Sequence, residues 1–305
     1  MGSFGGHALP GSFFILFAIW HALQICSRYF RSKTPQGPTY KSNTYFQSPC
    51  CASFPMESLI KVVSCSIGIA VETTAGWEWP EGGFGFPVIP GNRQHIAMYF
   101  FFGLGGFVEL LHFYHFHLPP SMAYITYILA LIVEAILFYF HVHGRPPMDV
   151  QVHMLLVLVV VAAAGVTGLE MQRRHSILPA LCRVYLILLQ GLWFWQVAFI
   201  LYPPPSMAKW DESDHKQMMS VTVLFCLQAG VAFFIVFVIW MGSACGHGQL
   251  RIAKERRKDI EYTSLAMNVL NGGRNGTIRS GADAAVKLVN DSDDEDELFS
   301  SSGRQ

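Results

Sequence analysis

The stretch VEAILFYFHVHGR at residues 133–145 combines side chains that bind metal ions or exchange protons in other proteins. Glu134 lies inside an apolar run, where a charged group is costly and marks a candidate functional site. His141 and His143 stand one residue apart at the end of that run. Histidine and carboxylate together suit zinc and related divalent ions, and histidine titrates near neutral pH. A structural interpretation competes with both: Glu134 then hydrogen-bonds a neighbouring helix, and the histidines lie among lipid headgroups.

The composition shows which elements must position these residues. Hydrophobic residues make up 52% of the chain, charged residues only 14%, and the mean hydropathy is +0.35. Soluble domains carry about 25% charged residues. Seven runs approach the roughly 20 apolar residues that cross a bilayer; they cover residues 9–26, 59–76, 95–115, 122–141, 152–169, 180–202 and 219–245. The sequence therefore predicts an all-α membrane protein with seven transmembrane helices in one bundle, in contact with the lipid bilayer.

The distribution of lysine and arginine predicts the orientation of the bundle. Basic residues favour the cytoplasmic side in short loops and near helix ends. With seven helices, one side receives Arg28, Arg31, Lys33, Lys41, Arg173, Arg174, Arg251, Lys254, Arg256, Arg257 and Lys258. The other side receives only Arg93, Arg145, Lys209 and Lys216. We expect a lumenal or extracellular N-terminus and a cytosolic C-terminus. The asymmetry also supports the second run, in which Lys61 is expected to extend towards the headgroups.

This topology gathers histidines from distant parts of the chain at the lumenal ends of the helices. His7 also precedes the first helix on that side. The candidate metal ligands are His95, His141, His143, His153 and His215, with Glu134 and Asp149 as acidic partners. Glu134 and His141 are seven residues apart, so both lie on nearly the same face of one helix, about 10 Å apart along its axis. The cofactor that such a set would hold is a divalent metal such as zinc; the alternative is a proton-responsive cluster.

A second histidine pattern carries less chemical weight. Glu109 and His112 form Glu-x-x-His, which di-iron helical bundles use in duplicate with further carboxylates. The chain has no second copy, so we interpret this pair as ordinary polar residues near the end of the third helix. Gly103, Gly105 and Gly106, just before it, are expected to let helices approach closely.

Several stretches resemble the transmembrane protein 45 family. They are GHALPGSFF at residues 6–14, MYFFFGLGG at 98–106, VEAILFYFHVHGR at 133–145, VHMLLVLVV at 152–160, LILLQGLWFWQ at 186–196 and LYPPPSMAKWDESDH at 201–215. The resemblance covers about residues 6–245. It implies a multi-pass protein of Golgi, endosomal or lysosomal membranes without an established activity. The stretch ELLHFYHFH at residues 109–117 departs from the family pattern.

The chain after residue 246 has a different composition. We expect a transmembrane domain over residues 1–246 and a disordered cytosolic tail over residues 247–305, because the tail is rich in polar and charged residues and ends in a DSDDEDE run. Tyr262 and Leu265 match the spacing of a tyrosine-based sorting signal read by clathrin adaptors. Such a signal predicts cycling among the trans-Golgi network, endosomes, lysosomes and the plasma membrane. Nucleic-acid binding is not expected, since the formal net charge is zero and basic residues flank helices.

Three functional hypotheses follow from these patterns. The favoured one is a non-enzymatic membrane protein whose lumenal cluster binds an ion or responds to pH. The second is an intramembrane zinc-dependent hydrolase of a lipid-like substrate, with Glu134 or Asp149 as base; no compact histidine signature supports it. The third is an ion or small-molecule transporter, although no inverted repeat is evident.

Overall fold

The computed structural model describes residues 3–47, 53–79 and 85–272. Each predicted apolar run lies in a helix, apart from the last one or two residues of the second, third and sixth runs. The helices are α1 (Phe4–Ser32), α2 (Met56–Ala75), α3 (Pro90–Phe113), α4 (Met122–His141), α5 (Pro147–Gln172), α6 (Ile177–Leu201) and α7 (His215–Gly272). All seven are long and apolar enough to cross a membrane. The prediction of an all-α bundle with seven spans is confirmed, including the second run. The chain is a multi-pass membrane protein.

Short-range signals in the sequence set the ends of the helices. The hydroxyl of Ser3 accepts a hydrogen bond from the backbone N–H of Gly6 and caps α1. Helices α3 and α5 begin at Pro90 and Pro147, where the missing N–H of proline costs no helical hydrogen bond. Helix α6 ends just before the prolines at residues 203–205, since proline cannot continue the backbone hydrogen bonding.

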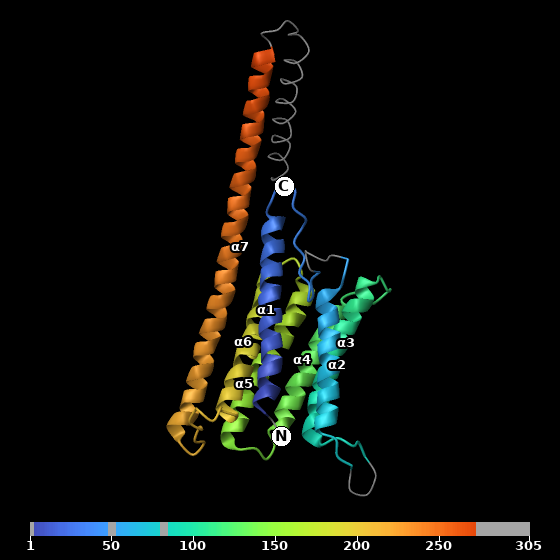
Figure 1. Cartoon of the computed structure of the whole chain (residues 1–305), viewed down its shortest axis with the longest axis vertical. Coiled ribbons are helices and arrows are strands. Elements are labelled where there is room, and N and C mark those ends of the chain that lie inside the picture. The colour runs from blue at the N-terminus through green and yellow to red at the C-terminus, as the bar shows by residue number, and fades with distance from the viewer. Residues whose placement is uncertain (1–2, 48–52, 80–84, 273–305) are drawn as a thin grey trace. The chain divides into compact units, whose positions relative to one another are not determined.

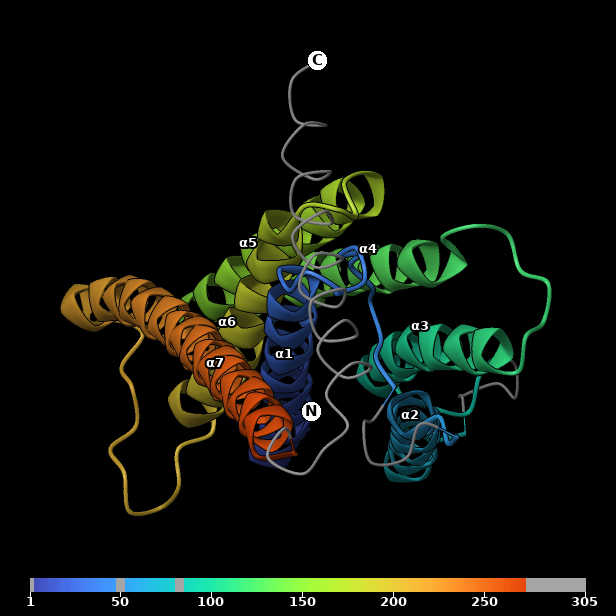
Figure 2. The same cartoon turned by 90° about the horizontal axis from the view of Figure 1, so that it is seen from above.

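Residues Met1–Ala244 form one compact unit in which neighbouring helices run roughly antiparallel (Figure 1). Helix α1 packs on α6, α6 on α5, and α5 on α4. Helix α4 then contacts α3, and α3 pairs with α2. Seen from above, α2 and α3 therefore form one side of the bundle and α5 and α6 the other (Figure 2). We call the end where α1 begins the N-terminal end; α2, α4 and α6 finish there.

Two glycines bring α1 and α6 into backbone contact. A Cβ atom added to Gly191 would lie 2.8 Å from the carbonyl oxygen of Gly11 and equally close to the backbone nitrogen of Ile15. Lipid tails are as apolar as leucine, so helices in a membrane associate through such close packing and through hydrogen bonds rather than through hydrophobic burial. Beside this contact, the indole N–H of Trp195 donates to the hydroxyl of Ser12 at 3.1 Å.

The α2–α3 contact uses two of the three glycines that the sequence analysis singled out. A Cβ atom on Gly106 would lie 2.9 Å from Cβ of Lys61, and one on Gly103 would lie 3.1 Å from Cβ of Cys65. Gly105 has nothing within 4 Å of its added Cβ, so the prediction of close approach is wrong at that position. The small residues at 103 and 106 let α2 lie directly against α3.

The second unit is Cys245–Gln305. Helix α7 is described as far as Gly272, and the rest of the expected tail, residues 273–305, lies outside the described residues. The stretch from 250 to 270 contains no glycine or proline and is rich in leucine, alanine, lysine, arginine and glutamate, all strong helix formers. Local propensity therefore favours a helix up to Gly272.

Candidate functional site

Four histidines meet at the N-terminal end of the bundle, and three of them were predicted to do so. The ring centroids of His141 and His153 lie 5.7 Å apart, those of His95 and His141 lie 6.0 Å apart, and those of His7 and His153 lie 5.8 Å apart. These rings come from α1, α3, α4 and α5. We call His7, His95, His141 and His153, together with Glu72, Gln94, Arg145 and Asp149, the histidine cluster.

The contacts of His141 fix the position of its ring proton. Nη2 of Arg145 lies 2.8 Å from Nε2 of His141. A guanidinium group can only donate, so this imidazole nitrogen accepts. The proton therefore lies on Nδ1, which donates to Oε1 of Gln94 at 2.5 Å. Both ring nitrogens are engaged, and His141 is held as a neutral imidazole.

Asp149 links the arginine of the cluster to a second histidine. Arg145 donates from Nη1 to Oδ2 of Asp149 at 2.9 Å. Burial lowers the pKa of Arg145, but the hydrogen bond and charge of Asp149 outweigh this and raise it, so the guanidinium group stays charged. Nδ1 of His153 lies 2.7 Å from Oδ1 of Asp149 and 2.8 Å from its backbone oxygen. The carboxylate therefore holds both Arg145 and His153 in place.

Helices α2 and α3 contribute Glu72 and His95 to the histidine cluster. Nδ1 of His95 lies 3.1 Å from Oε1 of Glu72, and the side-chain amide of Asn92 donates to Oε2 of Glu72 at 2.7 Å. The carboxylate near the end of the second span is thus paired rather than exposed to lipid. It ties α2 to α3 at the N-terminal end.

Three of the predicted site residues lie elsewhere. His143 is exposed and stacks on Phe140 with ring centroids 5.7 Å apart, and His215 is exposed at the start of α7. Glu134 is buried, and both of its oxygens accept from the amide nitrogen of Gln190, at 2.9 and 3.0 Å. It therefore follows the structural interpretation: the hydrogen bond runs to a neighbouring helix rather than to the histidines.

The histidine cluster does not fit a divalent metal. Among the described residues, no group of three histidine, cysteine or acidic side chains converges as metal ligands do. The nitrogens of His141 are already bound to Gln94 and Arg145, and a permanent cation stands where a metal ion would need to approach. A zinc ion needs at least three free ligand atoms. The geometry thus leaves the zinc site, and a hydrolase that depends on it, without support.

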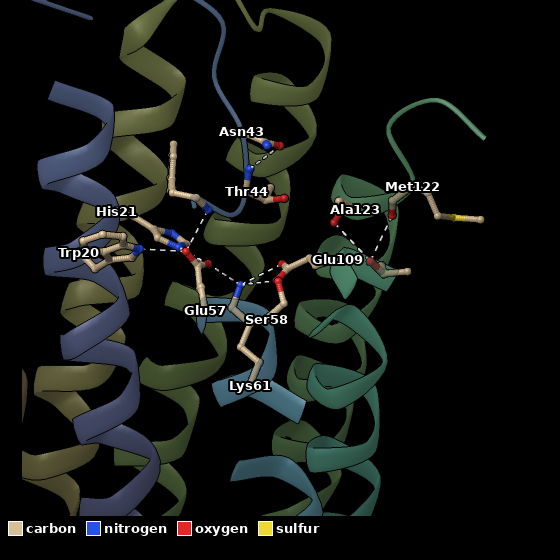
Figure 3. A network of polar contacts seen from close by, with 12 residues as sticks. Trp20, His21, Asn43, Thr44, Glu57, Ser58, Lys61, Glu109, Met122 and Ala123 are labelled. Atoms are coloured by element: carbon tan, nitrogen blue, oxygen red, sulfur yellow. Dashed lines mark hydrogen bonds and ion pairs between the residues drawn. The ribbon is translucent and has the colours of Figure 1, made fainter. Parts of the chain in front are cut away.

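A second polar site, which the sequence analysis did not predict, lies towards the opposite end of the bundle. We call it the buried ion network; it consists of Trp20, His21, Glu57, Lys61, Glu109, Glu170 and Arg183. Figure 3 shows the part formed by α1, α2 and α3. Five of these residues are buried inside helices that could span the membrane: Glu57, Glu109, Glu170, His21 and Arg183.

Glu57 accepts four hydrogen bonds from three parts of the chain. Its Oε2 accepts from the indole of Trp20 and from the backbone N–H of Phe46, both at 2.9 Å. Its Oε1 accepts from Nε2 of His21 at 2.8 Å and from Nζ of Lys61 at 2.7 Å. This carboxylate joins α1 to α2.

Lys61 lies between two carboxylates, as Figure 3 shows. Besides its contact with Glu57, its ammonium group donates to both oxygens of Glu109, at 2.8 and 3.0 Å. Ser58 donates to Oε2 of Glu109 at 3.1 Å. The expectation that Lys61 extends to the headgroups is therefore wrong, because two buried carboxylates hold its ammonium group inside the bundle.

Arg183 forms the other half of the network. It donates from Nε to Oε2 of Glu170 at 2.5 Å and from Nη1 to Nδ1 of His21 at 3.2 Å. Tyr124 also donates to Glu170, at 3.0 Å. Since Arg183 only donates, Nδ1 of His21 accepts, and its proton lies on Nε2, which faces Glu57. His21 is neutral in this arrangement.

An irregular segment after α1, residues 40–46, covers the network. Alternate side chains of the segment are buried, and Tyr40, Ser42, Thr44 and Phe46 are each less than a tenth exposed. Arg183 donates to the carbonyl of Asn43 at 3.0 Å, and Arg174 donates to that of Ser42 at 3.0 Å. The segment is thus fixed to the network through its backbone.

The residues of the predicted sorting signal are exposed on α7. Tyr262 is 70% exposed and Leu265 is 56% exposed. Both lie within a helix, three residues apart, so they project from nearly the same face.

Comparisons with known proteins agree with the membrane architecture. Residues 120–241 match the model of a family of unknown function (DUF716). The chain is 27% identical over 237 residues to transmembrane epididymal protein 1 of Rattus norvegicus. This match covers 74% of this chain and 76% of that protein. It is 28% identical over 233 residues to transmembrane epididymal protein 1A of Mus musculus, with the same coverage. It is 30% identical over 140 residues to transmembrane epididymal protein 1 of Homo sapiens; this match covers 45% of this chain and 50% of that protein.

The family match includes the half of the buried ion network that contains Glu170 and Arg183, and it begins after the half that contains His21, Glu57 and Glu109. On these findings, the chain is a distant homologue of transmembrane epididymal protein 1 with a DUF716 match over its helices α4 to α7.

Proposed function

We propose that this chain is a non-enzymatic, proton-responsive membrane protein of the Golgi and endosomal system, and that the histidine cluster detects acidification on its lumenal side. The observation that carries the proposal is the bond from Arg145 to the neutral His141, 5.7 Å from the ring of His153. A proton on Nε2 of His141 would place an N–H group against a guanidinium group, so the contact cannot survive protonation.

The balance of acidic and basic side chains in the histidine cluster favours the uptake of one proton over the uptake of several. With neutral histidines, Glu72 and Asp149 face the single permanent cation Arg145. A first proton neutralises the excess negative charge. Further protons add positive charge among rings about 6 Å apart, where like charges repel. Imidazole has a reference pKa of about 6.5, and the contact with Arg145 opposes protonation of His141, so the change begins below this value.

The location rests on the orientation predicted from the basic residues. It puts the histidine cluster in the lumen and residues 247–305 in the cytosol. Exposed Tyr262 and Leu265 would then be available to a clathrin adaptor. Tyr262→Ala should shift the protein towards the plasma membrane, and Tyr262→Phe, which keeps the ring but not the hydroxyl, is the matched comparison. An unchanged distribution with alanine would refute the sorting role.

The proton response has a natural optical reporter. The indole N–H of the buried Trp193 donates to the carbonyl of Val152 at 2.9 Å, directly beside His153. We would record tryptophan fluorescence of the full chain in lipid nanodiscs between pH 7.5 and 5.5. A reversible change is expected, and Trp193→Phe should remove most of it.

The matched variants use histidines inside and outside the cluster. The His141→Gln, His153→Gln double variant should lose the change, because glutamine hydrogen-bonds without titrating in this range. The His143→Gln, His215→Gln double variant should keep it, since both residues are exposed outside the cluster. A change that persists in the first variant, or no change in the wild type, would refute the proposal.

A further inference from the structure

We propose that Glu109 is a proton-binding carboxyl group, so that the buried ion network takes up and releases one proton at the end of the bundle opposite the histidine cluster. The ligand of this second site is the proton itself. The inference rests on the contacts of the network alone and stands whether or not the histidine cluster responds to pH.

The network has one carboxyl group too many for its cations. Among the described residues, Glu57, Glu109 and Glu170 form ion pairs with two permanent cations, Lys61 and Arg183. Two further arginines, Arg28 and Arg174, lie over the rings of Phe46 and Tyr124 rather than against these carboxyl groups. His21 adds no charge, because Arg183 donates to its Nδ1. With all carboxyl groups ionised, a negative charge would remain uncompensated in a site removed from water. An uncompensated buried charge is costly, and one added proton removes it.

Glu57 and Glu170 are the two carboxyl groups best held as anions. Glu57 accepts from an indole, an imidazole, a backbone N–H and Lys61. Glu170 accepts twice from Arg183, at 2.5 and 3.3 Å, and once from the hydroxyl of Tyr124. Hydrogen bonds to the charged form favour that form. Neither group is therefore the preferred site of the proton.

Of the three carboxyl groups in the buried ion network, Glu109 has the weakest set of donors. Its oxygens accept from Ser58 and from Lys61, and Lys61 is shared with Glu57. Neither an arginine nor a histidine contacts it in the described part of the chain. If Glu109 is protonated, Lys61 can remain with Glu57 and Ser58 can still donate to the carbonyl oxygen. The proton then removes the excess charge without breaking the rest of the network.

His21 is the other group that could take the proton, and its surroundings oppose this. A proton on Nδ1 would face Nη1 of Arg183, which now lies 3.2 Å away and donates to it. The cost is a lost hydrogen bond and a repulsive contact between two cations. At Glu109 the proton meets neither cost, so we assign it to the carboxyl group.

The groups that face Glu109 come from several elements. They are Glu57, Ser58 and Lys61 of α2 and Tyr45 of the segment after α1. On α3 itself, His112 lies one turn from Glu109, and its ring centroid is 6.0 Å from that of Tyr45. The side chain of Lys61 is 16% exposed, whereas that of Glu109 is 4% exposed. Lys61 is thus the more open member of the pair.

Infrared difference spectroscopy of the full chain in nanodiscs tests the assignment. A protonated carboxylic acid has a C=O stretching band that the carboxylate lacks. Glu134 is a second buried carboxyl group, and it faces only the neutral amide of Gln190, so it would contribute a band of its own. The test therefore uses Glu134→Gln as its background. The spectrum of that variant at pH 5 minus that at pH 9 should contain the carboxylic acid band, and adding Glu109→Gln should abolish it.

A rescue experiment separates proton binding from mere stability. Lys61→Met leaves Glu109 buried without its cation and should lower the unfolding temperature. Adding Glu109→Gln should restore most of the loss, since glutamine imitates the protonated acid and Ser58 can donate to its oxygen. Three results would each overturn the inference. They are persistence of the infrared band when Glu109→Gln is added to Glu134→Gln, absence of the band from Glu134→Gln, and a Lys61→Met, Glu109→Gln variant no more stable than Lys61→Met.

Discussion

Arg145 lies 2.8 Å from His141 and donates to the nitrogen that an added proton would occupy. The same arrangement recurs at the other end of the bundle, where Arg183 donates to His21. In both places an arginine holds an imidazole in its neutral form and also binds a carboxylate. The bundle thus carries a histidine, arginine and carboxylate unit near each end, with Glu134 and Gln190 between them on α4 and α6.

The contact between α1 and α6 should not tolerate a methyl group. Gly191→Ala would place its Cβ 2.8 Å from backbone atoms of α1, and overpacking of this kind costs about 1–3 kcal/mol. Gly168→Ala is the control, because nothing lies within 4 Å of its added Cβ. Thermal unfolding in nanodiscs should show a lower midpoint for the first variant only. Equal midpoints would contradict the backbone contact.

Removing Arg183 should be among the most damaging single changes in the network. Arg183→Met leaves the carboxylate of Glu170 buried without its cation, and breaking a buried ion pair in this way costs about 3–5 kcal/mol. The Arg183→Met, Glu170→Gln double variant should recover part of the loss, because no unpaired charge remains. The unfolding free energies of the two single variants and the double variant measure the coupling. Additive effects would show that the pair is not coupled.

Glu134 should act as a hydrogen-bond partner whose charge is not needed. Glu134→Gln keeps a side-chain oxygen facing the amide of Gln190, so stability should change by less than about 1 kcal/mol. Glu134→Leu leaves that amide without its acceptor, at a cost of about 1–3 kcal/mol. Comparing the two unfolding midpoints checks the assignment. A large loss in the glutamine variant would indicate a role for the negative charge.

The orientation can be tested with inserted N-glycosylation acceptor sites. A site inserted after Trp79, between α2 and α3, should be glycosylated, because the basic residues predict that this loop is lumenal. A site inserted after Gln36, between α1 and α2, should stay unmodified. Gel mobility with and without glycosidase treatment gives the result. The reverse pattern would place the histidine cluster in the cytosol and remove its link to lumenal pH.

The helices and part of the site could be predicted because hydropathy acts over long windows. Seven apolar runs were enough to identify seven helices, and the resulting topology brought His95, His141 and His153 together. It also suggested His143 and His215, which share the same end of the bundle but are exposed. Topology gives the height of a residue along the bundle, but the direction of its side chain depends on packing that one sequence does not reveal.

The buried ion network escaped prediction for a different reason. Glu57, Glu170 and Arg183 lie near helix ends, where charged residues usually contact headgroups. Their partners come from five helices and the segment after α1, so no local spacing connects them. Lys61 and Glu109 were visible in the sequence as charged residues inside apolar runs. Pairing them required knowing that α2 lies against α3.

The most direct test of the proton response is the unfolding midpoint of the full chain in nanodiscs at pH 7.5 and at pH 5.5. Protonation breaks the contact between Arg145 and His141, so stability should be complete above about pH 6.5, the reference value for imidazole, and should decrease below it. The wild type and His143→Gln should show this decrease, and His141→Gln should show much less of it. An equal decrease in His141→Gln and the wild type, or a wild-type midpoint that does not change between the two pH values, would contradict the account.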